Sequence, residues 1–153
     1  MTALPDSLRA QPLLRQWLAL RPDGGVRAFT GKVDIGQGIT HALKLIVAEE
    51  LRLPASSIEM VTASTQHSPD EAVTSGSLSV QHSGTALRCA AAHLRERCRL
   101  AMAAHHDVAP EAVRCVDGRF EIRGGTAASQ SYSDLLEQIE EIDATLWDSP
   151  IDP

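Results

Sequence analysis

A pair of glycines around one glutamine, Gly36-Gln37-Gly38, constrains the fold of this chain more than any other stretch. It separates a strand-like run at residues 26–35 from a run with helical spacing of apolar residues at 39–51. Glycine lets the backbone turn tightly and lie against a ligand, and a glutamine amide offers both a donor and an acceptor. The helix behind the turn would direct its unpaired N–H groups and positive dipole end to the same place. The stretch therefore predicts either an ordinary strand-to-helix turn or a ligand-binding loop.

The composition limits the classes of protein to which the chain can belong. At 153 residues it makes one domain, or part of one from a larger protein, and with 3% aromatic residues its core must be aliphatic. A net charge of −6 and a single basic cluster, Arg95, Arg97 and Arg99, predict that nucleic acid is not a partner. No run approaches the ~18 apolar residues that span a bilayer, and residues 1–10 do not resemble an export signal.

The cysteines bear on the cellular compartment. Cys89, Cys98 and Cys115 are odd in number and lack the spacing of a metal site, which predicts reduced thiols in a cytoplasmic protein. The spacing of Cys89 and Cys98 places them on opposite sides of a helix, which indicates packing rather than a redox pair.

The sequence divides the chain into an extended N-terminal arm at residues 1–14, a domain at 15–142 and a frayed acidic tail at 143–153. Within the domain, residues 15–20 and 26–30 are predicted to form a hairpin through the turn at 22–25. Residues 57–62 are predicted to form a further strand, followed by a polar loop at 63–74.

Two helices dominate the rest of the pattern. One is predicted at residues 39–51, ended by Pro54, and a longer one from near Ser79 to His105-His106. A hairpin at 113–122 around Asp117-Gly118 and a last helix capped by residues 131–134 follow. We expect an α+β fold in which a small mixed or antiparallel sheet is covered by the two main helices.

A second candidate site is the hydroxyl-rich stretch at residues 74–84, where the long helix begins. One of its serine or threonine hydroxyls must cap the helix, but five of them exceed what a cap requires. Free N–H groups and hydroxyls at a helix start suit an anionic or strongly polar ligand. The stretch therefore predicts either a plain cap or a polar pocket shared with Gln37.

Other polar residues give weaker signals. Asp70-Glu71 fits a catalytic pair, but carboxylates on a polar loop are more often simply solvated. The histidines share no ligand spacing, and the sequence holds no Gly-x-Ser-x-Gly elbow. The sequence therefore predicts neither a catalytic residue nor a metal ligand within this chain.

Read together, two ordered segments resemble a known family. TGKVDIGQGITHALKLIVAEELRLP (residues 30–54) and SPDEAVTSGSLSVQHSGTALRCAAAHLR (68–95) are similar to the molybdopterin-binding large subunits of the xanthine dehydrogenase/aldehyde oxidase family. The resemblance is strongest to the isoquinoline 1-oxidoreductase and nicotinate dehydrogenase branch, in which a WLxLxPDG-like strand and turn precede such a segment. It covers roughly residues 8–125.

The resemblance implies roles for particular residues. Gln37 matches the glutamine that hydrogen-bonds the pterin, and Gly36 and Gly38 let the backbone approach it. The resemblance extends the cofactor-binding set to Thr40, Gly76, Ser77, Leu78 and Ser79. In the family no protein side chain need ligate the molybdenum, so none is expected here.

The resemblance also implies partners and a reaction. The family hydroxylates an aromatic heterocycle or aldehyde C–H with oxygen from water and passes electrons to iron–sulfur clusters, here 2Fe–2S clusters on a partner subunit. Whether the molybdopterin carries a cytosine dinucleotide stays open. The family's catalytic glutamate lies in a Gly-Val-Gly-Glu-type motif that this sequence lacks. We therefore expect the chain to be one cofactor-binding piece, either a split subunit or a truncated relative, with the glutamate on a complementary molybdopterin-binding subunit in a bacterial hetero-oligomer. We expect the Gly76 and Gly84 side of the long helix to meet that partner.

Two other hypotheses remain open on the sequence. The chain could be a non-catalytic binding or assembly module related to the family, or a degenerate reading frame that folds without a function. The retained Gly36–Gly38 and Thr74–Ser79 stretches favour a cofactor-binding subunit over a decaying one, since a decaying site has no reason to keep polar residues.

Overall fold

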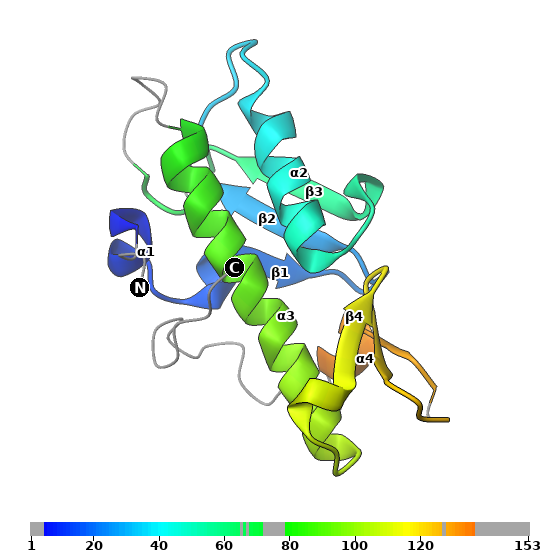
Figure 1. The fold of residues 1–153 in the computed structure, drawn as a ribbon. Coiled ribbons are helices and arrows are strands. Elements are labelled where there is room, and N and C mark those ends of the chain that lie inside the picture. The colour runs from blue at the N-terminus through cyan, green and yellow to red at the C-terminus, as the bar shows by residue number, and fades with distance from the viewer. Residues whose placement is uncertain (1–4, 65, 67, 72–78, 127, 137–153) are drawn as a thin grey trace.

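The computed structural model describes residues 5–64, 66, 68–71, 79–126 and 128–136, which form two small sheets around a pair of helices (Figure 1). The elements in chain order are α1 (Asp6–Ala10), β1 (Leu18–Leu20), β2 (Val26–Thr30), α2 (Ile39–Leu51), β3 (Ile58–Thr62), a π turn (Val80–Gly84), α3 (Thr85–His105), β4 (Val113–Val116), β5 (Arg119–Ile122), β6 (Gln130–Ser131) and α4 (Tyr132–Leu136). The α+β fold expected from the sequence is confirmed.

The first sheet has the order β1-β2-β3 and is mixed. β1 pairs antiparallel with β2, Leu18 lying opposite Ala28. β2 and β3 are parallel, from Val26 opposite Ile58 to Thr30 opposite Thr62, and α2 makes the crossover between them. The carboxyl ends of both parallel strands therefore meet at one edge, the place where α/β units bind ligands.

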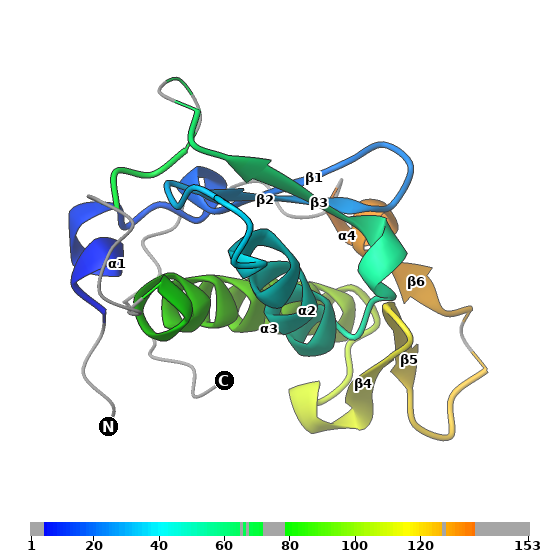
Figure 2. The ribbon, with the colours of Figure 1, turned by 90° about the horizontal axis from the view of Figure 1, so that it is seen from above.

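The two main helices lie side by side beneath this sheet (Figure 2). Small residues on α3, among them Ala86, Ala90 and Ala91, are fully buried and let the helices approach closely. At the start of the long helix, a Cβ on Gly84 would lie 2.9 Å from the Cδ1 of Ile46 on α2. The expectation that the Gly84 side faces a partner is wrong, because α2 already covers it; Gly76 lies outside the described residues.

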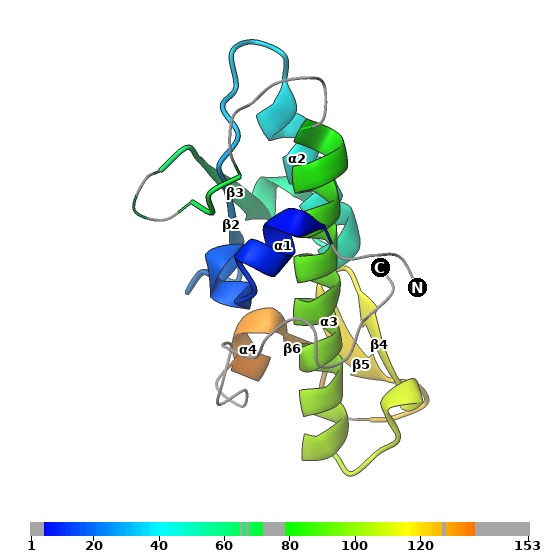
Figure 3. The same ribbon diagram turned by 90° about the vertical axis from the view of Figure 1, so that its left-hand side faces the viewer.

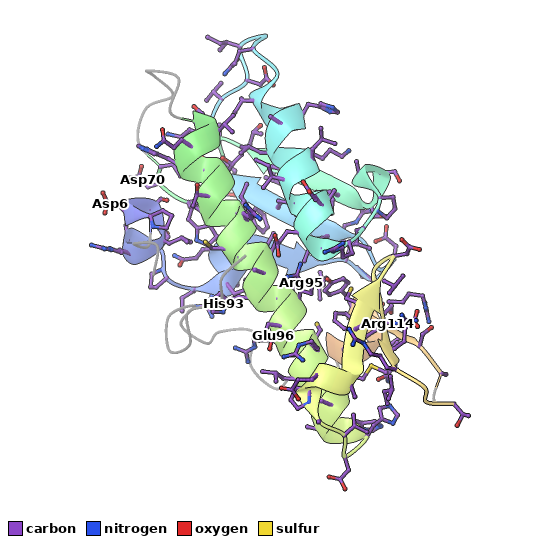
Figure 4. The ribbon with its side chains drawn as sticks, viewed as in Figure 1. Asp6, Asp70, His93, Arg95, Glu96 and Arg114 are labelled. Carbon is purple, nitrogen blue, oxygen red and sulfur yellow. The ribbon has the colours of Figure 1, made fainter. Side chains whose placement is uncertain are left out.

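An ion pair fixes the helices relative to each other. Glu50 of α2 is buried and its carboxylate lies 2.6 Å from Arg95 and 3.3 Å from Arg88, both on α3. Figure 4 shows Arg95 on the side of α3 that faces α2, with His93 on another side. Removing one partner of such a pair leaves a buried charge, so the pair selects one helix arrangement.

The second sheet, β4-β5-β6, packs at the C-terminal end of both helices. β4 and β5 form the predicted hairpin, and Asp117 and Gly118 both have positive φ, as the tight turn requires. Tyr132 is buried, donates a 2.9 Å hydrogen bond to the carbonyl of Leu51, and packs edge-on against Phe120 at 5.0 Å. The predicted cap of the last helix is confirmed where the Asp134 N–H donates to the Ser131 hydroxyl.

The N-terminal residues differ from their prediction. Residues 6–10, expected to be extended, form α1, and Leu8 is fully buried in the core. Trp17 is also fully buried, and its Nε1 donates a 2.9 Å hydrogen bond to the Gln11 carbonyl. A five-residue helix is stable only through such contacts, which local sequence patterns do not reveal. The boundaries at residues 14 and 142 stay a prediction, and the tail at 143–153 lies outside the described residues.

Candidate functional site

The Gly36-Gln37-Gly38 turn lies in an exposed loop, residues 33–38, between the end of β2 and the start of α2 (Figure 1). Asp34 organises this loop. Its Oδ1 accepts hydrogen bonds from the N–H groups of Gly36 (2.9 Å) and Gly38 (3.3 Å), and its Oδ2 accepts one from Thr40 (3.2 Å). The backbone bonds from Gly36 and Thr40 hold the pKa of the Asp34 carboxyl below its ordinary value.

Asp34 changes the expectation for the helix start. The sequence predicted that α2 would direct unpaired N–H groups at a ligand, but Asp34 already engages the Thr40 N–H in the first turn. A carboxylate at a helix N-terminus satisfies both the free donors and the dipole. An anion that binds here would therefore have to displace the Asp34 carboxylate from these N–H groups or share the N–H groups with it.

The Gln37 side chain is turned back onto its own loop. Its Oε1 accepts from the Ile35 N–H over 2.6 Å, and its Nε2 donates to the Val33 carbonyl over 3.0 Å. The residue is exposed, so a bound ligand can compete for the same amide groups. These bonds hold the loop in shape while the pterin role of Gln37 stays a prediction.

The two glycines of the turn leave space on the loop surface. Gly36 has φ +101° and Gly38 has φ +76°, and a Cβ on either would meet no atom within 4 Å. They are glycine because of backbone conformation and not because of crowding. The open space on this side of the loop is where a large ligand could lie against the backbone.

The other predicted cofactor residues divide into two groups. Thr40 and Ser79 are described, and both are half-buried. Gly76, Ser77 and Leu78 lie outside the described residues. The start of the long helix, which Ser79 precedes, lies at the same end of the helix pair as the loop at 33–38 (Figures 1 and 3). The structure therefore brings Ser79 to the end of the molecule that carries Gly36–Gly38.

Glu71 is the residue that sequence reasoning missed. It was expected to be solvated, but its Oε2 accepts hydrogen bonds from the Thr30 hydroxyl (2.7 Å) and from the Gly31 N–H (2.8 Å). Its backbone carbonyl accepts a 2.7 Å hydrogen bond from the Lys32 ammonium. The expectation failed because these partners are about forty residues away in the sequence, and no local pattern signals such a contact.

The described residues give no sign of a metal centre or a reactive thiol. No group of three or more His, Cys, Asp or Glu within the described ranges could hold a metal ion. Cys89, Cys98 and Cys115 form no disulfide among the described residues. Burial raises the pKa of Cys98 to about 12 and also raises the pKa of Cys115, which keeps both as poorly reactive thiols. The cytoplasmic location stays a prediction.

Within the described ranges, every helix is too short or too polar to span a lipid bilayer.

The fold defines an α+β domain, and the comparison with protein families shows which one. A family model described as "Molybdopterin cofactor-binding domain" matches residues 7–149. The chain belongs to this family, as a molybdopterin-binding segment of the xanthine dehydrogenase/aldehyde oxidase type.

Two curated relatives agree with this assignment. The chain is 37% identical to a nicotinate dehydrogenase subunit of Pseudomonas putida over 124 residues, 81% of this chain and 10% of that protein. It is 33% identical to the gamma subunit of the 6-hydroxypseudooxynicotine dehydrogenase complex of Paenarthrobacter nicotinovorans, over 66% of this chain and 13% of that one. The chain therefore spans about a tenth of the length of the relatives that it matches.

Solved structures share the fold. CO dehydrogenase from Oligotropha carboxidovorans superposes with a TM-score of 0.68 at 26% identity, covering 77% of this chain and 15% of that one. Quinoline 2-oxidoreductase from Pseudomonas putida 86 gives 0.63 at 24% identity, with coverage of 84% and 17%, and supports the fold alone. In both structures the fold is a small part of a much longer chain.

Proposed function

We propose that this chain is the cofactor-binding part of a multi-chain molybdenum hydroxylase. The enzyme would hydroxylate a C–H bond of an N-heteroaromatic compound or an aldehyde with oxygen from water. Electrons would pass to 2Fe–2S clusters on an iron–sulfur subunit, and a complementary molybdopterin-binding subunit would supply the catalytic glutamate. Membership of the molybdopterin-binding family and the similarity to subunits of two dehydrogenases support this proposal.

The observation that carries the proposal is the exposed loop at the carboxyl ends of β2 and β3. Gly36 and Gly38 leave free space beside the backbone, which fits a cofactor too large for a closed pocket. Asp34 holds the loop in shape through the N–H groups of Gly36 and Gly38, so little ordering entropy is lost when a ligand binds. These residues therefore fit a molybdopterin group.

The chain's own residues would bind and orient the cofactor. The backbone at Gly36 and Gly38 would lie against the pterin, and Gln37 would exchange its loop hydrogen bonds for bonds to the pterin. Thr40 and Ser79, with Gly76, Ser77 and Leu78, would complete the contact surface. When bound, the molybdenum cofactor supplies the two-electron oxidation chemistry, and no residue of this chain is assigned a proton transfer.

Co-expression tests the proposal. The chain would be produced alone and together with the neighbouring reading frames that encode a Gly-Val-Gly-Glu motif and iron–sulfur cysteines. We expect the lone chain to show no hydroxylase activity and the set to elute as one complex with molybdenum and pterin, with an interface of about 1,600 Å² or more. Size-exclusion chromatography, metal analysis and an electron-acceptor assay provide the readouts. Activity from the lone chain would refute the split site.

A second candidate is a non-catalytic binding or assembly module related to the family. The observation that favours it is the self-contained loop, in which both ends of the Gln37 amide already have partners. In the same co-expression experiment this module would join a complex, or bind a partner, without adding molybdenum or pterin to it. The metal content of the purified complex therefore separates the two functions.

A further inference from the structure

Two segments that are distant in the sequence meet at the base of the exposed loop. β2 ends at Thr30, which is fully buried, and the chain then passes through Gly31 and the buried Lys32 into the loop at 33–38. The segment at 68–71 lies against this point, with Pro69 buried. In Figure 4, Asp70, the neighbour of Glu71, is labelled beside the upper half of α3.

Glu71 makes three contacts there, one to each of three successive residues. Its side-chain Oε2 binds the Thr30 hydroxyl and the Gly31 N–H, and its main-chain carbonyl binds the Lys32 ammonium. Glu71 thus contacts each of the last three residues before the loop, through the backbone at Gly31 and through the side chains of Thr30 and Lys32. Hydrogen bonds to a carboxylate are about twice as strong as neutral ones, so the contact holds the chain firmly.

At Gly31 the chain lies so close to residues 69–71 that there is no room for a side chain. A Cβ on Gly31 would overlap the Pro69 carbonyl oxygen and lie 3.2 Å from the Glu71 nitrogen. Gly31 therefore permits a direct approach of two backbones, in contrast to Gly36 and Gly38, which face open space. The close backbone approach at Gly31 and the hydrogen bonds of the Glu71 side chain together hold the two segments at this separation.

We propose that Glu71 is a positioning residue of the cofactor site, which holds the base of the loop at 33–38 against the segment at 68–71. This inference rests on the proposed function, because the loop carries Gly36, Gln37 and Gly38, and residue 71 leads in sequence to the predicted contacts at 76–79. Glu71 acts through these residues and does not itself touch the cofactor.

The two oxygens of Glu71 make the proposal testable. Oε2 alone accepts both side-chain hydrogen bonds, whereas Oε1 is buried and has no hydrogen-bond partner among the described residues. Glu71→Gln can therefore keep both bonds through its amide oxygen while losing the charge. Glu71→Asp keeps the charge but is shorter by one carbon–carbon bond, about 1.5 Å, and cannot reach both partners without moving the chain.

The experiment has one readout on the chain alone and one on the cofactor. Amide hydrogen exchange at Gly31, measured by NMR on the isolated full chain, reports the contact itself. Pterin content, measured by fluorescence of the oxidised pterin after co-expression in a cofactor-producing host with the partner frames, reports the site. Glu59→Gln and Glu59→Asp are matched controls, because Glu59 is half-buried on β3 and pairs with Arg27 near the start of β2, at the opposite end of that strand from Thr30.

We expect Glu71→Gln, whose two bonds remain but become neutral and weaker, to lower Gly31 protection and pterin content by no more than about threefold. Glu71→Asp should lower protection at Gly31 at least tenfold and pterin content at least fivefold, at an unfolding temperature close to that of Glu71→Gln. Thr30→Val, which loses one of the two Glu71 bonds and the bond from the Lys32 N–H to the Thr30 hydroxyl, should fall between them. The Glu59 variants should change neither readout.

Other outcomes overturn the proposal in distinguishable ways. If Glu71→Asp keeps the pterin and Glu71→Gln loses it, the charge acts directly on the ligand and Glu71 is not a positioning residue. If all variants keep the pterin, the contact is merely structural. If the wild-type complex holds no pterin while the protection at Gly31 follows the expected pattern, the proposed function is wrong. The cofactor role of Glu71, which rests on that function, is then wrong as well.

Discussion

The two ends of α2 are built differently. At its C-terminal end the Leu51 carbonyl accepts a hydrogen bond from the buried Tyr132, and Leu53 packs so closely on Gly118 that a Cβ there would overlap it. At its N-terminal end the helix begins in an exposed loop, capped by Asp34, with Ile35 84% exposed. One end is used to hold the fold together and the other is left open, which is the arrangement expected of a binding site on a rigid scaffold.

The largest effect is expected at the closed end. Tyr132→Ala removes a buried aromatic ring and its hydrogen bond, and should lower the free energy of unfolding by about 3–5 kcal/mol. Tyr132→Phe keeps the ring and leaves the Leu51 carbonyl without this donor, at a cost of about 1–2 kcal/mol. Chemical denaturation monitored by circular dichroism measures both. Equal stability of the two variants would mean that this end is not closed by packing.

The next effect is expected on the cofactor and not on the fold. Gln37→Ala in the assembled enzyme removes an amide that is predicted to bind the pterin, a loss of about 1–3 kcal/mol in retention. Because Gln37 is exposed, the unfolding temperature of the free chain should change little. Molybdenum and pterin content of the purified complex are the measurements. Unchanged occupancy would remove Gln37 from the site.

A smaller effect is expected from pH at the open end. The folded-state pKa of Asp34 is lowered below the ordinary value of 3.8, so Asp34 stabilises the fold at neutral pH and this contribution is lost as the pH falls below about 4. Thermal unfolding of wild type and Asp34→Asn, compared at pH 6 and pH 3, tests this. The variant should lose less stability on acidification than wild type, and an equal loss would assign the effect to other carboxylates such as Asp134.

The smallest effect on stability is expected at the tip of the loop. Ile35→Ser should change the free energy of unfolding by no more than about 0.5 kcal/mol, because this side chain is mostly in solvent. Leu43→Ser is the contrasting variant. Leu43 lies on the buried face of α2, the helix that follows the loop, so this variant should destabilise the fold strongly. Equilibrium denaturation gives both values. A large loss from Ile35→Ser would show that the loop is part of the core.

Much of the framework could be predicted from the sequence. Apolar residues repeated every three to four positions, together with Pro54, gave α2 its bounds of Ile39–Leu51, and the Asp117-Gly118 turn gave the β4–β5 hairpin. The pairing of β2 with β3 follows because the crossover helix between them must bury its apolar face on the sheet. Such features depend on neighbours in the sequence, and periodicity reports them directly.

What only the tertiary structure decided are the contacts between distant residues. Residues 6–10 are helical because Leu8 is buried in the core. The Gly84 side of the long helix is covered by α2, so it is not the free surface that its small residues suggested. Asp34 accepts the Thr40 N–H at the start of α2, where the sequence predicted free N–H groups, and Glu71 reaches Thr30 and Gly31 across about forty residues. The sequence determined which residues the loop offers to a ligand. The packing of segments 30–32 and 69–71 against each other decided where that loop is held. A hydrogen bond forms wherever the fold brings a donor and an acceptor together, so it leaves no pattern in the local sequence.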